Sequence, residues 1–157
     1  MNSLIQTLDL QFSDLQQRSN ELIAKVPPDK LFWQPGENPH GLPIYSCGEY
    51  LLRSVGAVEQ TFNGITAKLW DDPFEWTLPE ELSTPAKVSA YFLEVEAARL
   101  RGFALLKSDD DLKRELAAPV KLKTVFALLL ETLARSENLQ GRAFATFRLF
   151  SGKQPFV

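Results

Sequence analysis

The sequence contains one histidine and one cysteine, two residue types that often act as catalytic bases, nucleophiles or metal ligands. His40 lies between Pro39 and Gly41, and one imidazole alone forms neither a multi-histidine metal site nor a serine triad. Cys47 follows Ser46, which we expect to cap a helix, and the helix dipole there would lower the pKa of the thiol and favour a reactive thiolate. We favour the simpler interpretation, a loop histidine and a small buried cysteine.

Two glutamate–arginine pairs offer a second kind of chemistry. Glu49 precedes Arg53 by four residues, and Glu131 precedes Arg135 by the same distance. On a helix this order gives an ordinary ion pair worth about 0.2–0.5 kcal/mol. Two guanidinium groups that face one cleft can instead hold a carboxylate, a phosphate or a sulfonate. The helix face of Arg53 also carries small residues that suit close packing more than open solvent, which would place Arg53 at the rim of a cleft: Gly56, Ala57 and Gly64.

Other motifs with a known chemistry are missing from the sequence. The acidic run Asp109–Asp111 lacks the spaced ligands, the glycine and the distal glutamate of a calcium loop, so we expect a solvated turn. We find no phosphate-binding glycine loop, nucleophile elbow, dinucleotide fingerprint or pair of zinc cysteines. The sequence therefore predicts no catalytic residue, no metal site and no cofactor.

Length and composition predict one soluble globular domain over residues 1–157. The chain is 45% hydrophobic and 24% charged, and its net charge of −3 disfavours binding to nucleic acid or to anionic membranes. The longest apolar run, Val125–Leu130, is far shorter than the ~20 residues that span a membrane. A single cysteine and an N-terminus without a basic leader, but with Asp9 and Asp14, predict a cytoplasmic protein.

The elements that position these residues are four amphipathic helices. Apolar residues repeat at steps of three and four over about residues 5–26, 46–70, 84–107 and 124–150. The expected core-facing residues are Leu8, Phe12, Leu15 and Leu22 in the first segment, Val55, Val58, Phe62 and Leu69 in the second, Val88, Phe92, Val95 and Phe103 in the third, and Phe126, Leu130, Leu133, Phe144 and Phe147 in the fourth. Four helices without a strand pattern predict an all-α four-helix bundle with long crossover loops.

Local signals mark the ends of the helices and the loops between them. Ser46 with Glu49 forms a capping-box pattern, Thr84 is a good N-cap, and Gly152 ends the last helix. The proline and glycine density of residues 27–45 predicts a crossover loop without regular structure. Residues 109–116 are expected to form no more than a short helical turn before Pro119.

Aromatic residues gather in the two loops that follow the first and second helices. They are Trp33, Trp70, Phe74 and Trp76. Such a group forms either a hydrophobic pocket or a cap over one end of the bundle, and we favour the cap. Phe150 extends the helical spacing of Phe144 and Phe147, which is typical of a core or of a dimer interface.

Four segments of the chain together resemble the DinB/YfiT-like superfamily of helical bundles. They are residues 26–35 (VPPDKLFWQP), 46–52 (SCGEYLL), 137–142 (ENLQGR) and 148–152 (RLFSG). The resemblance covers nearly the whole chain and rests on the order and spacing of these short motifs. It implies a four-helix bundle that is often a dimer, and a family with thiol-dependent transferases, isomerases and members induced by DNA damage. Many members bind a divalent metal through three histidines.

The positions that match the three family histidines hold Arg53, Arg135 and Leu139. Guanidinium offers no lone pair to a metal, and leucine has no donor atom. The resemblance therefore implies a member that has lost the family metal centre. It also implies that both arginines enter the former metal cleft, so the candidate cleft residues are Arg53, Arg135, Glu49, Glu131 and Gln140.

Three functional hypotheses follow from these residues and from the resemblance. The first is a non-catalytic, homodimeric interaction, regulatory or stress-related protein, because all three metal ligands are missing. The second is a binding protein or metal-independent transferase for a small anion or a thiol conjugate, with Arg53 and Arg135 as anchors. The third is a divergent metalloenzyme with substitute ligands drawn from Glu49, Glu131, Glu137 or His40.

Overall fold

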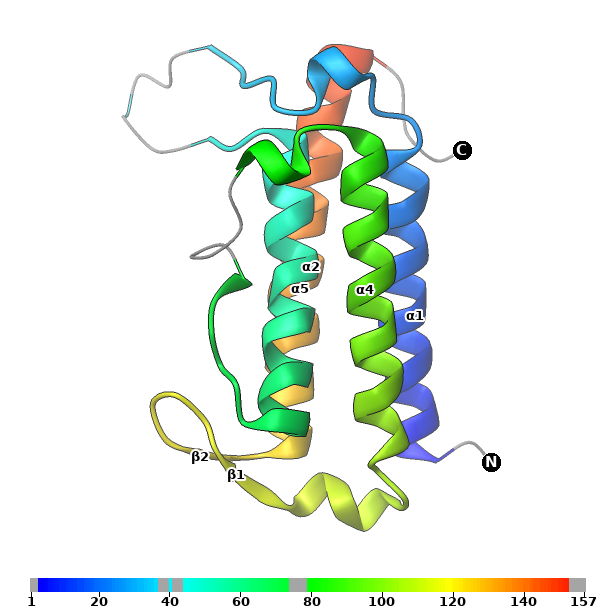
Figure 1. The fold of residues 1–157 in the computed structure, drawn as a ribbon, viewed down its shortest axis with the longest axis vertical. Coiled ribbons are helices and arrows are strands. Elements are labelled where there is room, and N and C mark those ends of the chain that lie inside the picture. The colour runs from blue at the N-terminus through cyan, green and yellow to red at the C-terminus, as the bar shows by residue number, and fades with distance from the viewer. Residues whose placement is uncertain (1–2, 37–39, 41–43, 74–78, 153–157) are drawn as a thin grey trace.

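Four long helices form the framework of the molecule (Figure 1). The computed structural model describes residues 3–36, 40, 44–73 and 79–152. Within them the helices are α1 (Leu4–Ile23), α2 (Cys47–Ala67), α4 (Pro85–Ala104) and α5 (Val125–Ser151). The all-α architecture predicted from helical periodicity is confirmed. None of these described helices is long and apolar enough to cross a membrane.

The helices pack around a shared core with α1 and α2 on opposite corners. Helix α4 lies beside both of them, and so does α5. α1 and α5 run in one direction along the bundle and α2 and α4 in the other (Figure 1). Because α2 and α4 are parallel neighbours, the chain between them has to return along the length of the bundle. This return brings Asp71, Asp72 and Pro73 past the outer side of α2.

Side-chain N-caps form at the starts of α2, α4 and α5; those at Ser46 and Thr84 were predicted, and the one at Thr124 was not. Each cap side chain accepts a hydrogen bond from the backbone amide three residues later: Ser46 for α2, Thr84 for α4 and Thr124 for α5. Gly152 ends α5 with a φ of 64°, a left-handed conformation that glycine adopts without strain. Only half of the capping box at Ser46 is present, because the Glu49 carboxylate binds Arg53.

Three of the predicted helices end earlier in the structure than in the prediction. α1 ends at Ile23, α2 at Ala67 and α4 at Ala104, each a few residues earlier than expected. After α2, Lys68 turns into the left-handed region with a φ of 57°, and Leu69, predicted to be in the core, is exposed. The loop after α1 also contains one 3-10 turn, Pro28–Lys30, because proline fixes a φ that suits the first position of a helical turn.

The segment between α4 and α5 contains a β-hairpin that the sequence analysis did not predict. A 3-10 turn (Asp109–Lys113) agrees with the expected short helical turn, but strand β1 (Glu115–Ala117) follows and pairs antiparallel with β2 (Leu122–Thr124). The Ala118 amide donates to the Lys121 carbonyl and closes the hairpin. Strands of three residues are too short to leave a period-two pattern in the sequence.

The predicted core faces of α1, α2 and α4 are buried with the exception of Leu69, but the face predicted for α5 is partly wrong. Phe126 is 38% exposed and Leu130 is 44% exposed. α5 buries another face, which carries Val125, Leu129, Thr132, Ser136, Gln140, Ala143 and Phe147. The reason is that α5 packs most extensively on α2, and this contact uses small polar residues in place of large apolar ones.

Buried hydroxyl groups join α2 to α5. Ser54 Oγ donates to the Ser136 carbonyl at 2.8 Å, and Ser136 Oγ donates to the Ser54 carbonyl at 3.0 Å. Two turns further along α2, the hydroxyls of Thr61 and Thr132 share a hydrogen bond. Because buried polar groups are costly when unpaired, these bonds fix one register between the two helices.

Candidate functional site

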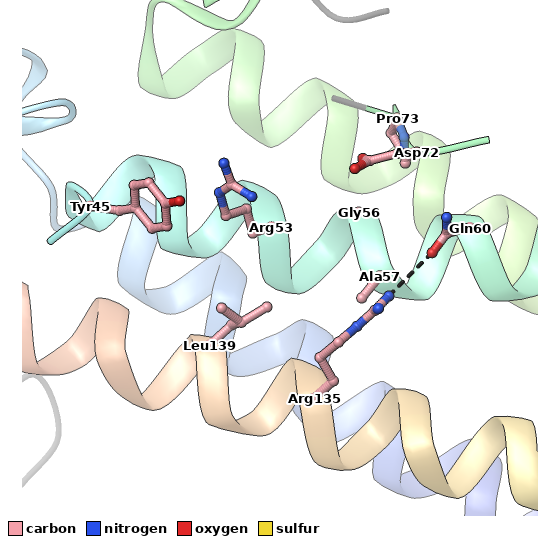
Figure 2. Close-up of a pocket in the computed structure, with 9 residues that line it drawn as sticks. All are labelled: Tyr45, Arg53, Gly56, Ala57, Gln60, Asp72, Pro73, Arg135 and Leu139. Atoms are coloured by element: carbon pink, nitrogen blue, oxygen red, sulfur yellow. Dashed lines mark hydrogen bonds between the residues drawn. The ribbon is translucent and has the colours of Figure 1, made fainter. Parts of the chain in front are cut away.

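Arg53 and Arg135 line one pocket on the side of α2 that faces α5 and the return segment (Figure 2). The pocket has a volume of about 290 Å³. Its described walls are Tyr45, Arg53, Gly56, Ala57, Gln60, Asp72, Pro73, Arg135 and Leu139. The structure thus brings together the two arginines predicted as anchors, although they lie 82 residues apart in the sequence. Their neighbours Ser54 and Ser136, which are hydrogen-bonded to each other, are separated by the same number of residues.

Arg53 is held in place by two neighbours. Its Nε and Nη2 donate to Glu49 Oε1 at 3.2 and 3.0 Å, so the predicted ion pair within α2 is confirmed. The guanidinium also lies over the ring of Tyr45, 4.3 Å from the ring centroid. Such contacts between a cation and an aromatic ring orient the charge. Arg53 therefore enters the pocket wall as a positioned and largely neutralised cation.

Arg135 has a different environment from the one predicted. The expected ion pair with Glu131 does not form, because Glu131 accepts a hydrogen bond from Lys123 on β2. Arg135 Nη2 donates instead to Gln60 Oε1 on α2 at 3.2 Å, which Figure 2 shows as the contact across the pocket. The amide is neutral, and no carboxylate in the described part of the chain forms an ion pair with Arg135.

Gln60 is the pocket residue that the sequence analysis missed. Its Nε2 donates to the Trp70 carbonyl at 2.8 Å, so its oxygen is turned toward Arg135. The ring of Trp70 packs on Gly64, where a Cβ atom would lie only 2.4 Å from the ring. A signal was present in the sequence, because Gln60 follows Arg53 by seven residues and shares its helix face.

Asp72 adds one negative charge to the pocket wall. It comes from the return segment, next to Pro73, and lies across the pocket from α5. Among the described residues that line it, the pocket thus combines two guanidinium groups with the Asp72 carboxylate. An anion bound there is expected near Arg135, because Arg53 already has Glu49 as its partner.

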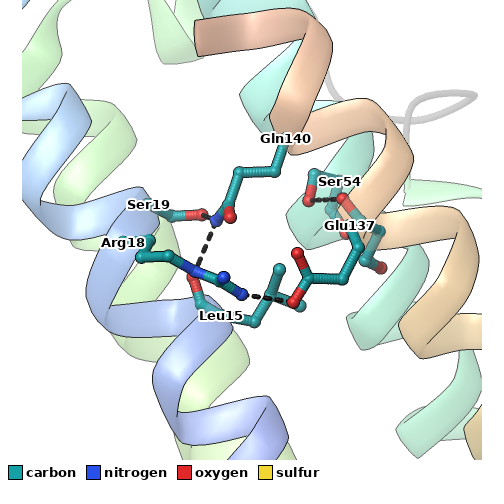
Figure 3. A network of polar contacts seen from close by, with 7 residues as sticks. Leu15, Arg18, Ser19, Ser54, Glu137 and Gln140 are labelled. Carbon is teal, nitrogen blue, oxygen red and sulfur yellow. Dashed lines mark hydrogen bonds and ion pairs between the residues drawn. The ribbon is translucent and has the colours of Figure 1, made fainter. Parts of the chain in front are cut away.

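Gln140 lies elsewhere in the bundle (Figure 3). Its side chain is 1% exposed, and Nε2 donates to the Leu15 carbonyl and to Ser19 Oγ on α1, both at 2.8 Å. Beside it, Arg18 of α1 pairs with Glu137 of α5. Gln140 joins two helices in the interior and is not among the residues that line the pocket.

Neither Cys47 nor His40 is among the residues that line the arginine pocket. Cys47 is completely buried, and desolvation raises the pKa of its thiol to about 12. The buried structural cysteine is confirmed, and the reactive thiolate is excluded by this burial. His40 is exposed on the loop between α1 and α2.

The three residues that the sequence resemblance matches to family histidines do not fit a metal ion. Leu139 lines the same pocket as Arg53 and Arg135, but none of the three side chains offers a donor to a metal. The alternative ligands are also dispersed, because Glu49, Glu131 and Glu137 each pair with a different cation. Across residues 3–36, 40, 44–73 and 79–152, no group of three histidine, cysteine, aspartate or glutamate side chains is placed to hold a metal.

The aromatic loop residues separate into two places. Trp33 packs edge-on against Phe150, with 5.7 Å between the ring centroids, at the end of the bundle where α5 finishes. Trp70 packs on α2 at Gly64. Phe74 and Trp76 lie outside the described residues. Trp33 thus acts as the end cap predicted for this group, whereas Trp70 supports the pocket through Gln60.

No protein-family model, no curated protein and no solved structure matches this chain. The resemblance to the DinB/YfiT-like superfamily therefore stays a prediction from the sequence motifs, and the chemistry of the site rests on its own residues.

Proposed function

We propose that this protein binds a small anionic ligand in the pocket between Arg53 and Arg135, and that it is a DinB/YfiT-like bundle without the family metal centre. The observation that carries the proposal is the environment of Arg135. Its guanidinium lines a cavity together with a second arginine and is hydrogen-bonded to a neutral amide. Of the hypotheses drawn from the sequence, anion binding is the one that this arrangement supports. Homodimer formation is part of the proposal through the resemblance alone, and a cytoplasmic location through the single cysteine and the acidic N-terminal residues.

The energetics favour exchange of the amide for an anion. A hydrogen bond between neutral groups contributes about 0.5–1.5 kcal/mol net, and one to a charged partner about 1.5–3 kcal/mol. Arg135 would gain a charged acceptor in place of Gln60, and its forked N–H groups match a carboxylate or a phosphate in two places at once. Arg53 lines the same pocket from the opposite helix, with most of its charge offset by Glu49.

The test is a titration of the full chain with acetate, inorganic phosphate and sulfate, followed by calorimetry and thermal unfolding. We expect at least one anion to bind, and we expect Arg135→Gln to weaken it about tenfold or more because the charged donor is lost. Arg142→Gln, which removes an exposed arginine outside the pocket on the same helix, is the matched control. Equal binding by these two variants, or no binding by the unmodified protein, would overturn the proposal.

Asp72→Asn tests the sign of the charge in the pocket. Removal of the carboxylate should tighten the binding of a simple anion, because one repulsive charge leaves the wall. Weaker binding of all three anions by this variant would contradict an anion site near Arg135.

A further inference from the structure

A second cavity adjoins the arginine pocket on the side of the β-hairpin. Its volume is about 250 Å³, and it lies between α2, α5 and the tip of the hairpin. One part of its wall is apolar: Trp70, Ala118, Pro119, Val120 and Leu128. The charged residues Lys123 and Glu131 also line it, and they neutralise each other in an ion pair.

The two cavities are consecutive sections of one groove along α2 and α5. On α2 the first cavity extends from Arg53 to Gln60, and the second begins at Gln60. On the antiparallel α5 the first is lined by Leu139 and Arg135, and the second continues from Arg135 to Leu128. Both cavities therefore share the pair Gln60 and Arg135, and the hydrogen bond between these two side chains is the partition.

Of the two side chains that form this partition, Arg135 is the one that can move. Gln60 is fixed by its second hydrogen bond, from Nε2 to the Trp70 carbonyl at 2.8 Å. Arg135 is an exposed side chain whose hydrogen bond to Gln60 is 3.2 Å long. If Arg135 turns toward an anion in the first cavity, its contact with Gln60 is released and the two cavities join.

We infer that the groove takes an amphiphilic anion, with the charged head at Arg135 and Arg53 and an apolar group in the hairpin cavity. This inference rests on the proposed anion site and adds the substrate class. A cavity of about 150 Å³ lined by apolar side chains holds benzene, so the hairpin cavity has room for a phenyl group or a medium-length alkyl chain. Its neutral ion pair and apolar wall favour a tail that carries no further charge.

The test compares ligands that differ only in the tail or in the charge. Acetate carries the head alone, 4-phenylbutyrate carries head and tail, and 4-phenyl-1-butanol carries the tail without the charge. Calorimetry on the full chain should show 4-phenylbutyrate binding at least tenfold more tightly than either of the other two. Equal affinities for acetate and 4-phenylbutyrate would overturn the tail site and leave the anion site standing. Absence of binding by both anions would overturn the anion site together with this inference.

Two variants of the hairpin supply the matched comparison. Val120 is 91% exposed and lines the hairpin cavity, whereas Leu122 is 64% exposed on the same hairpin and does not line it. Val120→Asp should lower the affinity for 4-phenylbutyrate about tenfold and leave that for acetate unchanged. Leu122→Asp should change neither. If both variants weaken 4-phenylbutyrate equally, the tail does not occupy this cavity and the inference fails.

Discussion

Replacement of Gln140 by leucine is the sharpest test of the buried polar contacts between α1 and α5. The amide nitrogen of Gln140 donates to the Leu15 carbonyl and to Ser19 Oγ at 2.8 Å each, inside a region where Gln140 is 1% exposed and Ser19 is fully buried. Leucine is close in size to glutamine but has no donor. The variant Gln140→Leu therefore removes two hydrogen bonds and leaves the Ser19 hydroxyl without this partner.

The expected loss of stability follows from these two bonds. Each contributes about 1 kcal/mol net, and a buried hydroxyl left without its partner costs about 1 kcal/mol more. We expect Gln140→Leu to lower the free energy of unfolding by about 3 kcal/mol. Ser19→Ala should cost about 1 kcal/mol, because Gln140 keeps its bond to Leu15. In the double variant the bond between the two side chains is lost only once and no serine hydroxyl is left unpaired, so its cost should be about 2 kcal/mol, which is about 2 kcal/mol short of the sum.

Urea unfolding of the three variants, followed by circular dichroism, measures these quantities, with an unchanged dependence on denaturant as the check for two-state unfolding. Asn138→Leu is the control, since Asn138 is exposed on the same helix and its replacement should change stability by less than about 0.5 kcal/mol. A loss below about 1 kcal/mol for Gln140→Leu, or strictly additive single effects, would refute the reasoning that these bonds join α1 to α5.

Three further predictions concern other parts of the bundle. Cys47, with its pKa raised to about 12 by burial, should resist thiol reagents at neutral pH and react only as denaturant unfolds the chain; rapid labelling of the native protein would contradict its burial. The Asp109 carboxylate accepts hydrogen bonds from two backbone amides at the start of α1, so Asp109→Ala should lower the free energy of unfolding in urea by about 0.5–2 kcal/mol. The control Asp110→Ala should lower it by less than about 0.5 kcal/mol. Burial raises the pKa of Glu59, whose carboxylate accepts a hydrogen bond from the Tyr91 hydroxyl. Because the folded pKa is higher than the unfolded one, Glu59 stabilises the folded state at low pH, and this stabilisation is lost as the pH rises through the folded pKa. Glu59→Gln should therefore be more stable than the unmodified chain at neutral pH and equal to it below the ordinary glutamate pKa, and paired unfolding curves with no such dependence on pH would contradict the assignment.

The sequence predicted those features of the fold that depend on neighbouring residues. The caps at Ser46 and Thr84 form because a hydroxyl reaches an amide only three residues away, whatever the rest of the chain does. The left-handed end at Gly152 is local in the same sense. The ion pair between Glu49 and Arg53 also needs only one turn of helix.

Features that depend on distant parts of the chain were predicted less well. Phe126 and Leu130 follow the apolar spacing of a core face, yet α2 selects the face of α5 that carries Thr132 and Ser136. Glu131 binds Lys123, because the hairpin brings that lysine beside α5. The hairpin itself was not predicted, so neither was the second cavity, which its tip helps to line.

The polar contacts between α2 and α5, which made the buried face of α5 hard to predict, also fix the positions of the two arginines in the candidate site. Ser54 and Ser136 exchange two hydrogen bonds, and their neighbours in the sequence are Arg53 and Arg135. A slip of α5 by one turn along α2 would move one arginine by about 5.4 Å relative to the other. Large apolar residues at this contact would allow several registers of similar energy, whereas two buried hydroxyls that each need the opposite carbonyl allow one. The serine pair therefore sets the spacing of the two guanidinium groups, and Gln60, two turns along α2, meets Arg135 as a result of that register.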